Sequence, residues 1–553
     1  MPMKSVFLAG VAALALVGCG GEGGDAGAST SRAASKAASP KAASPIDAKF
    51  SLKDAAPLDV DALFALMPGA SRPTYASADF DDKLGATVLT DLQFTDPSDG
   101  GGVTIDRVEL FGVDPDAMSR VNAATDASVD APFETIFEKV RLYGVQPNGE
   151  GDDAIINFGA VEIDKLQLRQ GGYDDTQDNP ALLFNAFDLG GLYFKDISVD
   201  ATEEEGPKVQ AALPDVRIVG VSGGKVGAIV INDMNYEIVQ TEETMQAMTG
   251  LLGEQGALLM NSPLRSFIAP GNQKASVKSF VWNGFDLSGL MAFSLKGEEP
   301  PYTAKNLVRL GSMELRDVET YINGELAYKT EKSTVTATES TWLIPTKVRA
   351  KSEGDTYNFT AYVPEGEEEL LQIVKDNGLD KIKGSSDMSW DWDSAKGGAA
   401  FKTNMDMSGF ANLAMGFDLD GLEIEKLAEA IGEGDEAAVA SIGQFNGFNL
   451  TLKDGKLLDT IFDIAALQMG GTGDDLRQSA PAMVRLSGAQ AAALNPRIQG
   501  YVDAFAAFLS DGGTLEISAN PDQAVPFADI AAAGETGPQT LPDVLDLTVT
   551  HKK

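Results

Sequence analysis

The sequence is poor in the residue types that usually bind metals. Its 553 residues include one cysteine, Cys19, and one histidine, His551. A zinc finger, a histidine-rich metal centre, an iron–sulfur cluster and an intramolecular disulfide all need more of these residues. His551 lies two residues from the end of the sequence, where we expect a frayed tail rather than a Ser-His-Asp site. We therefore predict no metal and no other cofactor.

Basic residues are also scarce. Lysine and arginine number 43 against 82 aspartates and glutamates, which gives a formal net charge of −39. Nucleic-acid binding depends on lysine and arginine side chains that neutralise phosphates, so this balance argues against a nucleic-acid partner. The hydrophobic fraction of 43% is nevertheless that of a folded protein rather than a disordered one.

The first 18 residues have the composition of a secretory signal peptide. Lys4 supplies a positive charge, and the apolar stretch from Val6 to Val17 is too short to cross a bilayer core of ~30 Å as a helix. It ends in Leu16-Val17-Gly18-Cys19. This tetrapeptide resembles the lipobox of bacterial lipoproteins. The resemblance implies that the Cys19 thiol receives diacylglycerol, that signal peptidase II cleaves before Cys19, and that the new amine is acylated.

The same resemblance has consequences for location. Several acyl chains such as palmitate, at ~0.8 kcal/mol per buried CH₂, are enough for stable membrane anchoring. The residue after the cysteine is Gly20 rather than the aspartate that favours retention in the inner membrane. We therefore expect a lipid-anchored protein of the bacterial cell envelope. The outer membrane, at its periplasmic face or at the cell surface, is favoured over the inner membrane.

Beyond the signal peptide, composition divides the chain into three parts. Residues 19–45, after the lipidated cysteine, are almost entirely glycine, alanine, serine and proline, which predicts a disordered tether. No second linker of this kind follows. We expect a β-rich lobe over residues 46–365 and a mixed α/β lobe over residues 366–553.

The body alternates short apolar runs with glycine, aspartate, asparagine and proline, which is typical of antiparallel strands and turns. Repeats support this interpretation: VTIDRVEL at 103–110 matches VEIDKLQL at 161–168. A second unit, of the form FDLxGL, recurs around Phe187, Phe285, Phe417 and, more loosely, Phe448. We predict an α+β fold that is predominantly antiparallel β, an elongated sheet of repeated strand–turn modules with a few packed helices. The four phenylalanines should face the core.

Particular elements can also be predicted. Residues 338–364 should form a hairpin that turns at Ser352–Asp355, with a bulge or an edge at Pro345. Helices are expected over 242–260 and 367–377. A further helix should begin after Asn495-Pro496, with Ile498, Val502, Phe505 and Leu509 on its buried face, and end at Gly512 before a strand at 514–518.

Catalytic motifs are weak. Gly220-Val221-Ser222-Gly223-Gly224 matches the G-x-S-x-G of a nucleophile elbow, and Ser222 with Lys225 matches S-x-x-K. An elbow requires a helix after the serine, whereas KVGAIVIND predicts a second strand. We therefore interpret the segment as a glycine-rich hairpin and predict no catalytic site. If the protein were an enzyme, a Ser222–Lys225 pair or paired carboxylates would be the first candidates.

Aspartates cluster at three places in the chain. None of the clusters has the spacing of an EF-hand loop, and a solvated acidic surface is the simpler interpretation, although oxygen-rich loops can bind Ca²⁺ weakly. The clusters are Asp79, Asp81 and Asp82; Asp152 and Asp153; and Asp174, Asp175 and Asp178.

Three functions remain open at this point. The first is a non-enzymatic scaffold or binding protein for an envelope protein, lipid or wall polymer. The second is an envelope hydrolase, and the third is a surface Ca²⁺-binding or adhesive lipoprotein. A concave apolar groove along the sheet would favour lipid handling, and a deep pocket that converges on carboxylates would favour an enzyme. A flat acidic surface would favour the third.

Overall fold

The computed structural model describes residues 39–66, 73–95, 102–123, 129–148, 154–170, 180–202, 207–240, 271–432 and 441–553. The predicted signal peptide, Cys19, the helix expected at 242–260 and two of the aspartate clusters (152–153 and 174–178) lie outside the described residues.

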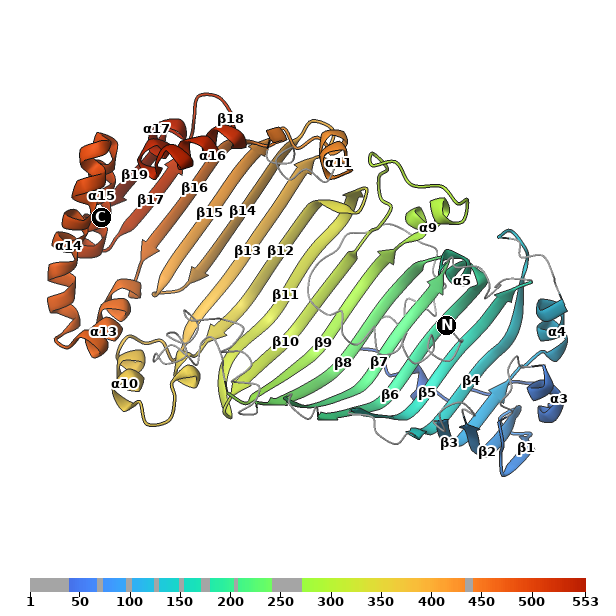
Figure 1. Ribbon diagram of the computed structural model, residues 1–553. Helices are drawn as coiled ribbons and strands as arrows, with labels where there is room; N and C mark the ends of the chain where they lie inside the picture. The colour runs from blue at the N-terminus through green and yellow to red at the C-terminus, as the bar shows by residue number, and fades with distance from the viewer. Residues whose placement is uncertain are drawn as a thin grey trace.

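The strands form one 19-stranded sheet (Figure 1). The strands are β1 (Ser77–Asp81), β2 (Ala86–Thr95), β3 (Gly102–Phe111), β4 (Phe133–Asn148), β5 (Ala154–Arg169), β6 (Phe187–Thr202), β7 (Lys208–Ser222), β8 (Lys225–Val239), β9 (Gln273–Asp286), β10 (Gly311–Ile322), β11 (Glu325–Thr341), β12 (Ile344–Tyr357), β13 (Ile382–Asp393), β14 (Gly398–Met407), β15 (Ala411–Asp420), β16 (Gln444–Asp454), β17 (Thr514–Ala519), β18 (Val525–Pro526) and β19 (Leu547–Lys552).

Short helices lie along the margins of the sheet, and a larger group lies at its C-terminal end (Figure 1). The helices are η1 (Pro45–Asp47), α3 (Val60–Ala65), α4 (Pro115–Ala123), α5 (Pro180–Ala186), α9 (Ser288–Ser294), η2 (Phe359–Tyr362), α10 (Glu368–Asp376), α11 (Ile424–Gly432), α13 (Leu457–Met469), α14 (Gly473–Leu494), α15 (Pro496–Asp511), α16 (Phe527–Thr536), η3 (Pro538–Thr540) and α17 (Leu541–Val544).

The sheet is an antiparallel meander. Each strand from β1 to β17 pairs with the next in the chain, β17 pairs with β19, and the two-residue β18 pairs with the start of β16. The described strands leave β1 and β19 at opposite edges, so the sheet is open (Figure 1). The predicted α+β fold with a dominant antiparallel sheet is confirmed. The two expected lobes share this sheet, because β12 and β13 pair across the boundary at 365/366.

The sheet bends along lines that cross the strands. On each strand from β2 to β12, one residue at the same position across the sheet is left out of the pairing with the neighbouring strand. On every second strand this residue has a positive φ. We call this line the central crease. Its positive-φ members are Asp91 (49°), Gly144 (65°), Asp196 (54°), Asp233 (56°), Asp317 (48°) and Gly354 (72°).

A second crease runs six residues away on the same strands. Its positive-φ members are Gly112 (59°), Lys165 (45°), Gly220 (67°) and Gly284 (73°), on odd-numbered strands or directly after them, and Gly311 (75°), which faces Gly284 from the start of β10. Glycine and aspartate dominate both lines because they adopt the left-handed conformation at least cost.

Each crease also shifts the inward-facing pattern by one residue. On β4, the side chains of Phe137, Val140, Leu142 and Val145 all pack in one cluster, although strict alternation would place the outer two on the opposite face. The spacing of three residues occurs where the strand crosses a crease. The repeated sequences at 103–110 and 161–168 both contain this spacing, since each strand crosses a crease there.

The creases explain why the hairpin predicted at 338–364 is wrong. β12 continues through Ser352–Asp355, where Gly354 is a crease residue rather than part of a turn, and residues 359–362 form the 3₁₀ helix η2. The turn comes earlier, where Thr341 pairs with Ile344. The bulge expected at Pro345 is confirmed, because the β11–β12 register shifts beside it.

Most of the other local predictions hold. α10 is followed by Gly378 at φ 71°, and α15 begins after Asn495, whose side chain accepts a hydrogen bond from the Arg497 amide. The buried face of α15 differs from the prediction, since Phe508 is buried and Phe505 is 41% exposed.

His551 is not frayed. It lies in β19 opposite Leu515, and its Nε2 is 2.7 Å from the Gly512 carbonyl oxygen. The predicted frayed tail at His551 is therefore wrong, because this residue belongs to the edge strand β19.

Residues 39–58, which we call the strap, run across successive strands on one face of the sheet, behind the strands in Figure 1. The Arg217 guanidinium on β7 donates to the carbonyl oxygens of Ser39 (3.0 Å) and Ala42 (2.8 Å). On β4, Arg141 donates to the Ala48 carbonyl oxygen at 2.8 Å. Residues 39–45, which we predicted to belong to the disordered tether, are therefore part of the fold.

Apolar contacts complete the path of the strap. Ile46 is buried against Ala160, Tyr193 and Val219, and the Phe50 ring meets Phe111 edge-on at 5.1 Å between centroids. A segment that crosses strands cannot join their ladder. Long cationic side chains that reach its carbonyl oxygens satisfy its backbone instead.

Beneath the strap lies a row of buried charges. Glu162 is fully buried, accepts a hydrogen bond from Arg141 at 2.7 Å and pairs with Lys139, which also binds Asp164. Farther along, Arg217 is 2% exposed and binds Asp215.

The Asp215 carboxyl sits in an environment that favours its charged form. Burial raises the pKa of Asp215, but hydrogen bonds from Arg217 and Asn232 and the charge of Arg217 outweigh burial and hold this pKa below its usual range. The carboxylate therefore stays ionised and keeps the strap-binding guanidinium of Arg217 in position.

Candidate functional site

Ser222 and Lys225 flank the β7–β8 turn. The predicted glycine-rich hairpin is confirmed, with Gly223 and Gly224 both at positive φ as a type I′ turn requires. The Ser222 hydroxyl donates to Asp188 Oδ2 at 3.1 Å, and the Lys225 ammonium lies 3.9 Å from Asp286 Oδ2. Each side chain thus engages a carboxylate on the neighbouring strand, and this arrangement is not that of a nucleophile with its base.

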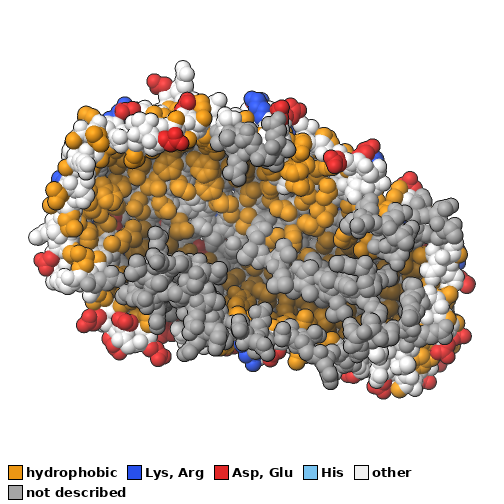
Figure 2. Space-filling model, viewed as in Figure 1, with side chains coloured by type: hydrophobic (Ala, Val, Ile, Leu, Met, Phe, Trp, Pro, Cys, Tyr) orange, Lys and Arg blue, Asp and Glu red, His pale blue; other side chains and the backbone are white. Residues whose placement is uncertain are grey.

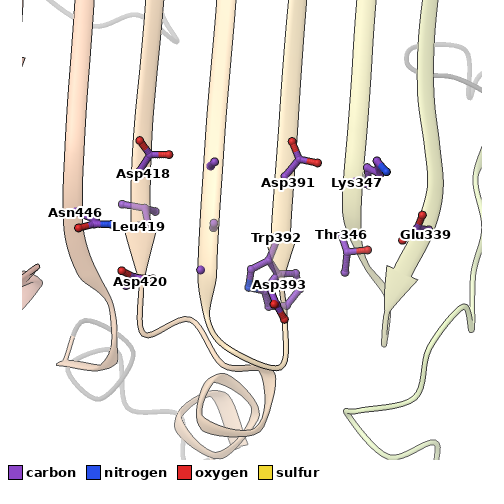
Figure 3. Close-up of a pocket in the computed structure, with 13 residues that line it drawn as sticks. Glu339, Thr346, Lys347, Asp391, Trp392, Asp393, Asp418, Leu419, Asp420 and Asn446 are labelled. Atoms are coloured by element: carbon purple, nitrogen blue, oxygen red, sulfur yellow. The ribbon is translucent and has the colours of Figure 1, made fainter.

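Several carboxylates line an open depression of about 500 Å³ on β11–β16 (Figure 3). Asp391 and Asp418 lie at one level with Ala400 between them, since each pairs with Ala400 in the ladder. Lys347 lies at the same level, and Arg349 donates to Asp391 at 2.6 Å. The depression is shallow and solvated, unlike a pocket that would hold a buried acid and base for hydrolysis.

The one described aspartate cluster lines a second open depression. Asp79, Asp81 and Asp82 lie beside Arg107 there, and Asp81 accepts hydrogen bonds from the amides of Lys83 and Leu84. Within the part of the chain that the structure describes, no group of three or more histidine, cysteine, aspartate or glutamate side chains is placed to hold a metal ion.

The face of the sheet opposite the strap is apolar over almost its whole length. One row of residues, each paired with the next across the ladder, runs from β3 to β19, and we call it the apolar row. Its members are Leu110, Val140, Ile163, Leu192, Ile218, Ile229, Trp282, Met313, Val335, Ala350, Met388, Thr403, Met415, Leu450, Ile517 and Val549. Thr403 alone is polar in this row.

The two faces have different partners. The strap and the charges beneath it belong to one face, because Arg141 and Lys139 alternate with Val140 and Leu142 along β4. Figure 2 shows the other face, where hydrophobic side chains fill a hollow over β12–β16.

The apolar face is open in this hollow. Over β2–β4 it packs against Val60 and Phe64 of α3, and over β5–β9 a cluster of buried residues is flanked by half-buried ones. Over β13–β15 seven apolar residues are half-buried or exposed, and we call them the groove floor. They are Met388, Trp390, Phe401, Met405, Leu413, Met415 and Phe417.

Helices and loops form the walls of this groove. At one end of the strands, Ile424 and Leu427 of α11 pack on Trp392 and Leu419. At the other end, Phe359 and Phe410 pack with α10. At the C-terminal end of the sheet, α13 and α15 cover β16, β17 and β19. The groove therefore runs across the strands and is closed by helices at that end.

Of the repeated phenylalanines, Phe187 begins β6 and Phe285 lies near the end of β9, whereas Phe417 and Phe448 lie inside β15 and β16 and pair with each other in the ladder. Phe417 stacks on Phe401 with 5.0 Å between ring centroids, and Phe285 meets Trp282 edge-on at 5.1 Å. All four are half-buried. They face the apolar side of the sheet as predicted, but they line its surface rather than fill a closed core.

Sequence reasoning missed the groove floor, although a signal was present. Leu413, Met415 and Phe417 alternate with the small residues alanine and glycine, and Met388, Trp390 and Trp392 alternate with polar residues. Alternation shows that one face is apolar, but it does not show whether another part of the chain covers that face.

The comparisons give no functional name. A protein-family model described only as an uncharacterized protein matches residues 404–552, about a quarter of the chain. This stretch runs from β14 through the helices at the closed end of the groove to β19. No curated protein matches the sequence. Among the described helices, none has the length and apolar character needed to cross a bilayer.

Proposed function

We propose that this protein is a non-enzymatic, lipid-anchored envelope lipoprotein that binds acyl chains of envelope lipids in the groove over β12–β16. The observation that supports this most strongly is the apolar row, which crosses sixteen strands with one polar residue. A sheet normally buries such a face against another layer of the protein. Over the groove floor the described residues supply no such layer.

The dimensions suit a single extended chain. The section from β12 to β16 spans four strand intervals, or about 19 Å at ~4.8 Å each. An acyl chain occupies one leaflet of a bilayer core, about half of ~30 Å. At ~0.8 kcal/mol per buried CH₂, contact with eight methylenes would contribute roughly 6 kcal/mol.

The side chains also suit a ligand of variable shape. Met388, Met405 and Met415 all face the groove side of the sheet. Methionine is flexible and polarisable and can adapt to different partners. This favours acyl chains over a partner protein, which would meet a fixed complementary surface.

Lipid extraction tests this proposal. Protein purified from envelopes in mild detergent should carry phospholipid or fatty acid detectable by mass spectrometry. A fatty acid with a photoreactive terminal group should cross-link to peptides that contain Met405 or Met415. Cross-links confined to the acidic depression, or a protein without lipid, would contradict acyl-chain binding.

A separate prediction concerns the lipid anchor at Cys19. Cys19→Ala should abolish labelling by radioactive palmitate and leave the full-length precursor, because the lipobox cysteine is the acylated residue and the cleavage marker. Labelling in cells followed by gel electrophoresis measures both effects. A Cys19→Ala variant that is still cleaved and labelled would overturn the lipoprotein assignment, and the groove would be unaffected.

A further inference from the structure

The C-terminal helices expose more apolar surface than any other part of the described chain. Seven of the thirteen large hydrophobic residues with high exposure lie between 461 and 505. The most exposed of all is Leu486 on α14, at 80%, and Met483 and Leu494 on the same helix are 57% and 65% exposed. Figure 2 shows hydrophobic side chains on this end of the molecule.

The second half of α14 presents an almost uncharged outer face. Its exposed residues from 482 to 494 are three alanines, two leucines, a methionine, a serine, a glutamine and Arg485. Arg485 is paired with Asp503 of α15 at 3.0 Å. The outer face of a helix in a water-soluble protein normally carries many charges, so this composition points to a nonaqueous environment.

This surface is held in place rather than frayed. Gly488 lies so close to α15 that an added Cβ would be 2.3 Å from Val502 Cγ2. In the first half of α14, Leu476 and Ala480 pack with Phe462 and Phe508 in the cluster that also includes sheet residues. The exposed residues of the second half are therefore displayed by a rigid helical pair.

The apolar surface is connected to the groove. The cluster that holds α13, α14 and α15 also contains Leu452, Ile517 and Val549. Ile517 and Val549 belong to the apolar row, so apolar residues are continuous from the groove floor to the helices. Docking of these helices on a membrane would therefore bring the groove close to the lipid that it binds.

We propose that α14 docks on a membrane surface, with Met483, Leu486 and Leu494 inserted among the lipid headgroups and upper acyl segments. This inference rests on the proposed function and places the C-terminal end of the groove next to the membrane. The described charges on α13–α15 are mostly acidic or paired, so insertion should depend on apolar contact rather than on anionic lipid.

The tether is long enough for this arrangement. The strap meets the sheet at β7, where Arg217 holds Ser39, and β19 lies eleven strand intervals away, about 53 Å at ~4.8 Å each. The 20 residues from Cys19 to Ser39 can extend to roughly 65 Å. The acylated cysteine and α14 could therefore reach one membrane together.

A fluorescence experiment tests the docking. The acylated full chain with Leu486→Cys has one free thiol, because Cys19 carries lipid, and this thiol is labelled with an environment-sensitive dye. In vesicles of phosphatidylethanolamine and phosphatidylglycerol, the dye should shift to the blue and be quenched by lipids with a nitroxide on the upper acyl chain. A dye on Lys402→Cys, an exposed site on the strap-bearing face of the sheet, should show neither effect.

A second variant separates docking from lipid binding. Leu486→Asp removes little packing, since the side chain is 80% exposed. It should slow lipid loading from vesicles roughly tenfold, the equivalent of about 1.4 kcal/mol, while the lipid bound at equilibrium stays unchanged.

The outcomes distinguish the two proposals. A dye at 486 that is not quenched, in protein that still carries lipid, would overturn the docking and leave the groove proposal intact. A blue shift that requires added envelope protein and occurs without quenching would show that α14 binds a protein instead. A chain that carries no lipid but whose dye is quenched would contradict the groove proposal alone.

Discussion

Met415→Glu should deplete the purified protein of bound lipid by a factor of at least ten. The Met415 side chain is half-buried in the middle of the groove floor, between Thr403 and Leu450 in the apolar row. A carboxylate there would face an acyl chain with no partner, and leaving a charge unpaired against an apolar group costs well over the ~1.4 kcal/mol that corresponds to tenfold. Mass spectrometry of extracted lipid, per mole of protein, measures the effect.

The neighbouring residue provides a matched control. Ala414 lies on the same strand, is also half-buried and faces the opposite side of the sheet, between Asn404 and Thr451. Ala414→Glu introduces the same charge one residue away and should leave lipid content near that of the unmodified protein. Equal lipid loss in both variants would point to general damage, and full lipid content in Met415→Glu would remove the groove as the binding site.

Glu162→Gln should lower the free energy of unfolding by about 3–5 kcal/mol. Glu162 is fully buried and is shared by Lys139 and Arg141. Its loss would leave Arg141 with no buried countercharge, although Lys139 would keep Asp164. Because whole domains are stable by only about 5–15 kcal/mol, the effect should be easily seen in urea unfolding followed by circular dichroism.

The same variant should loosen the strap, since Arg141 also holds the Ala48 carbonyl oxygen. Limited proteolysis should then cut within residues 39–50 earlier than in the unmodified protein. The control is Glu319→Gln, which removes a surface partner of Lys329 and should leave the unfolding curve nearly unchanged. A Glu162→Gln protein as stable as this control would show that the buried charges do not stabilise the fold.

The sequence was most informative where one short segment decides the structure. The Asn495-Pro496 start of α15 and the Gly223-Gly224 turn each depend on the local conformational preferences of a few residues. The repeated units also predicted the dominant antiparallel sheet.

Two predictions failed because parts of the chain that are distant in sequence decide the local structure. Ser352–Asp355 has the composition of a turn, but inside a long strand the same glycine at positive φ makes a crease. The strap was misjudged for a different reason: alanine, serine and proline contribute little burial themselves, and Arg217, far away in the sequence, fixes their carbonyl oxygens. Neither case can be decided from residues near in sequence.

The groove could be predicted from the sequence only in part. Its apolar residues alternate visibly in the sequence, yet their partial exposure depends on where α10, α11 and α13 end. An open apolar face and a covered one have the same pattern along a strand.

The alternation of left-handed residues limits how a sheet of this kind can change in length. In the central crease, from β2 to β12, they fall on even-numbered strands. This pattern repeats only after two strands, and a single added strand would place two left-handed residues side by side and reverse the direction of the chain beyond it. Adding or removing a whole hairpin does neither. The creased part of the sheet should then vary in length among related genes in steps of about 10 Å, two strand spacings.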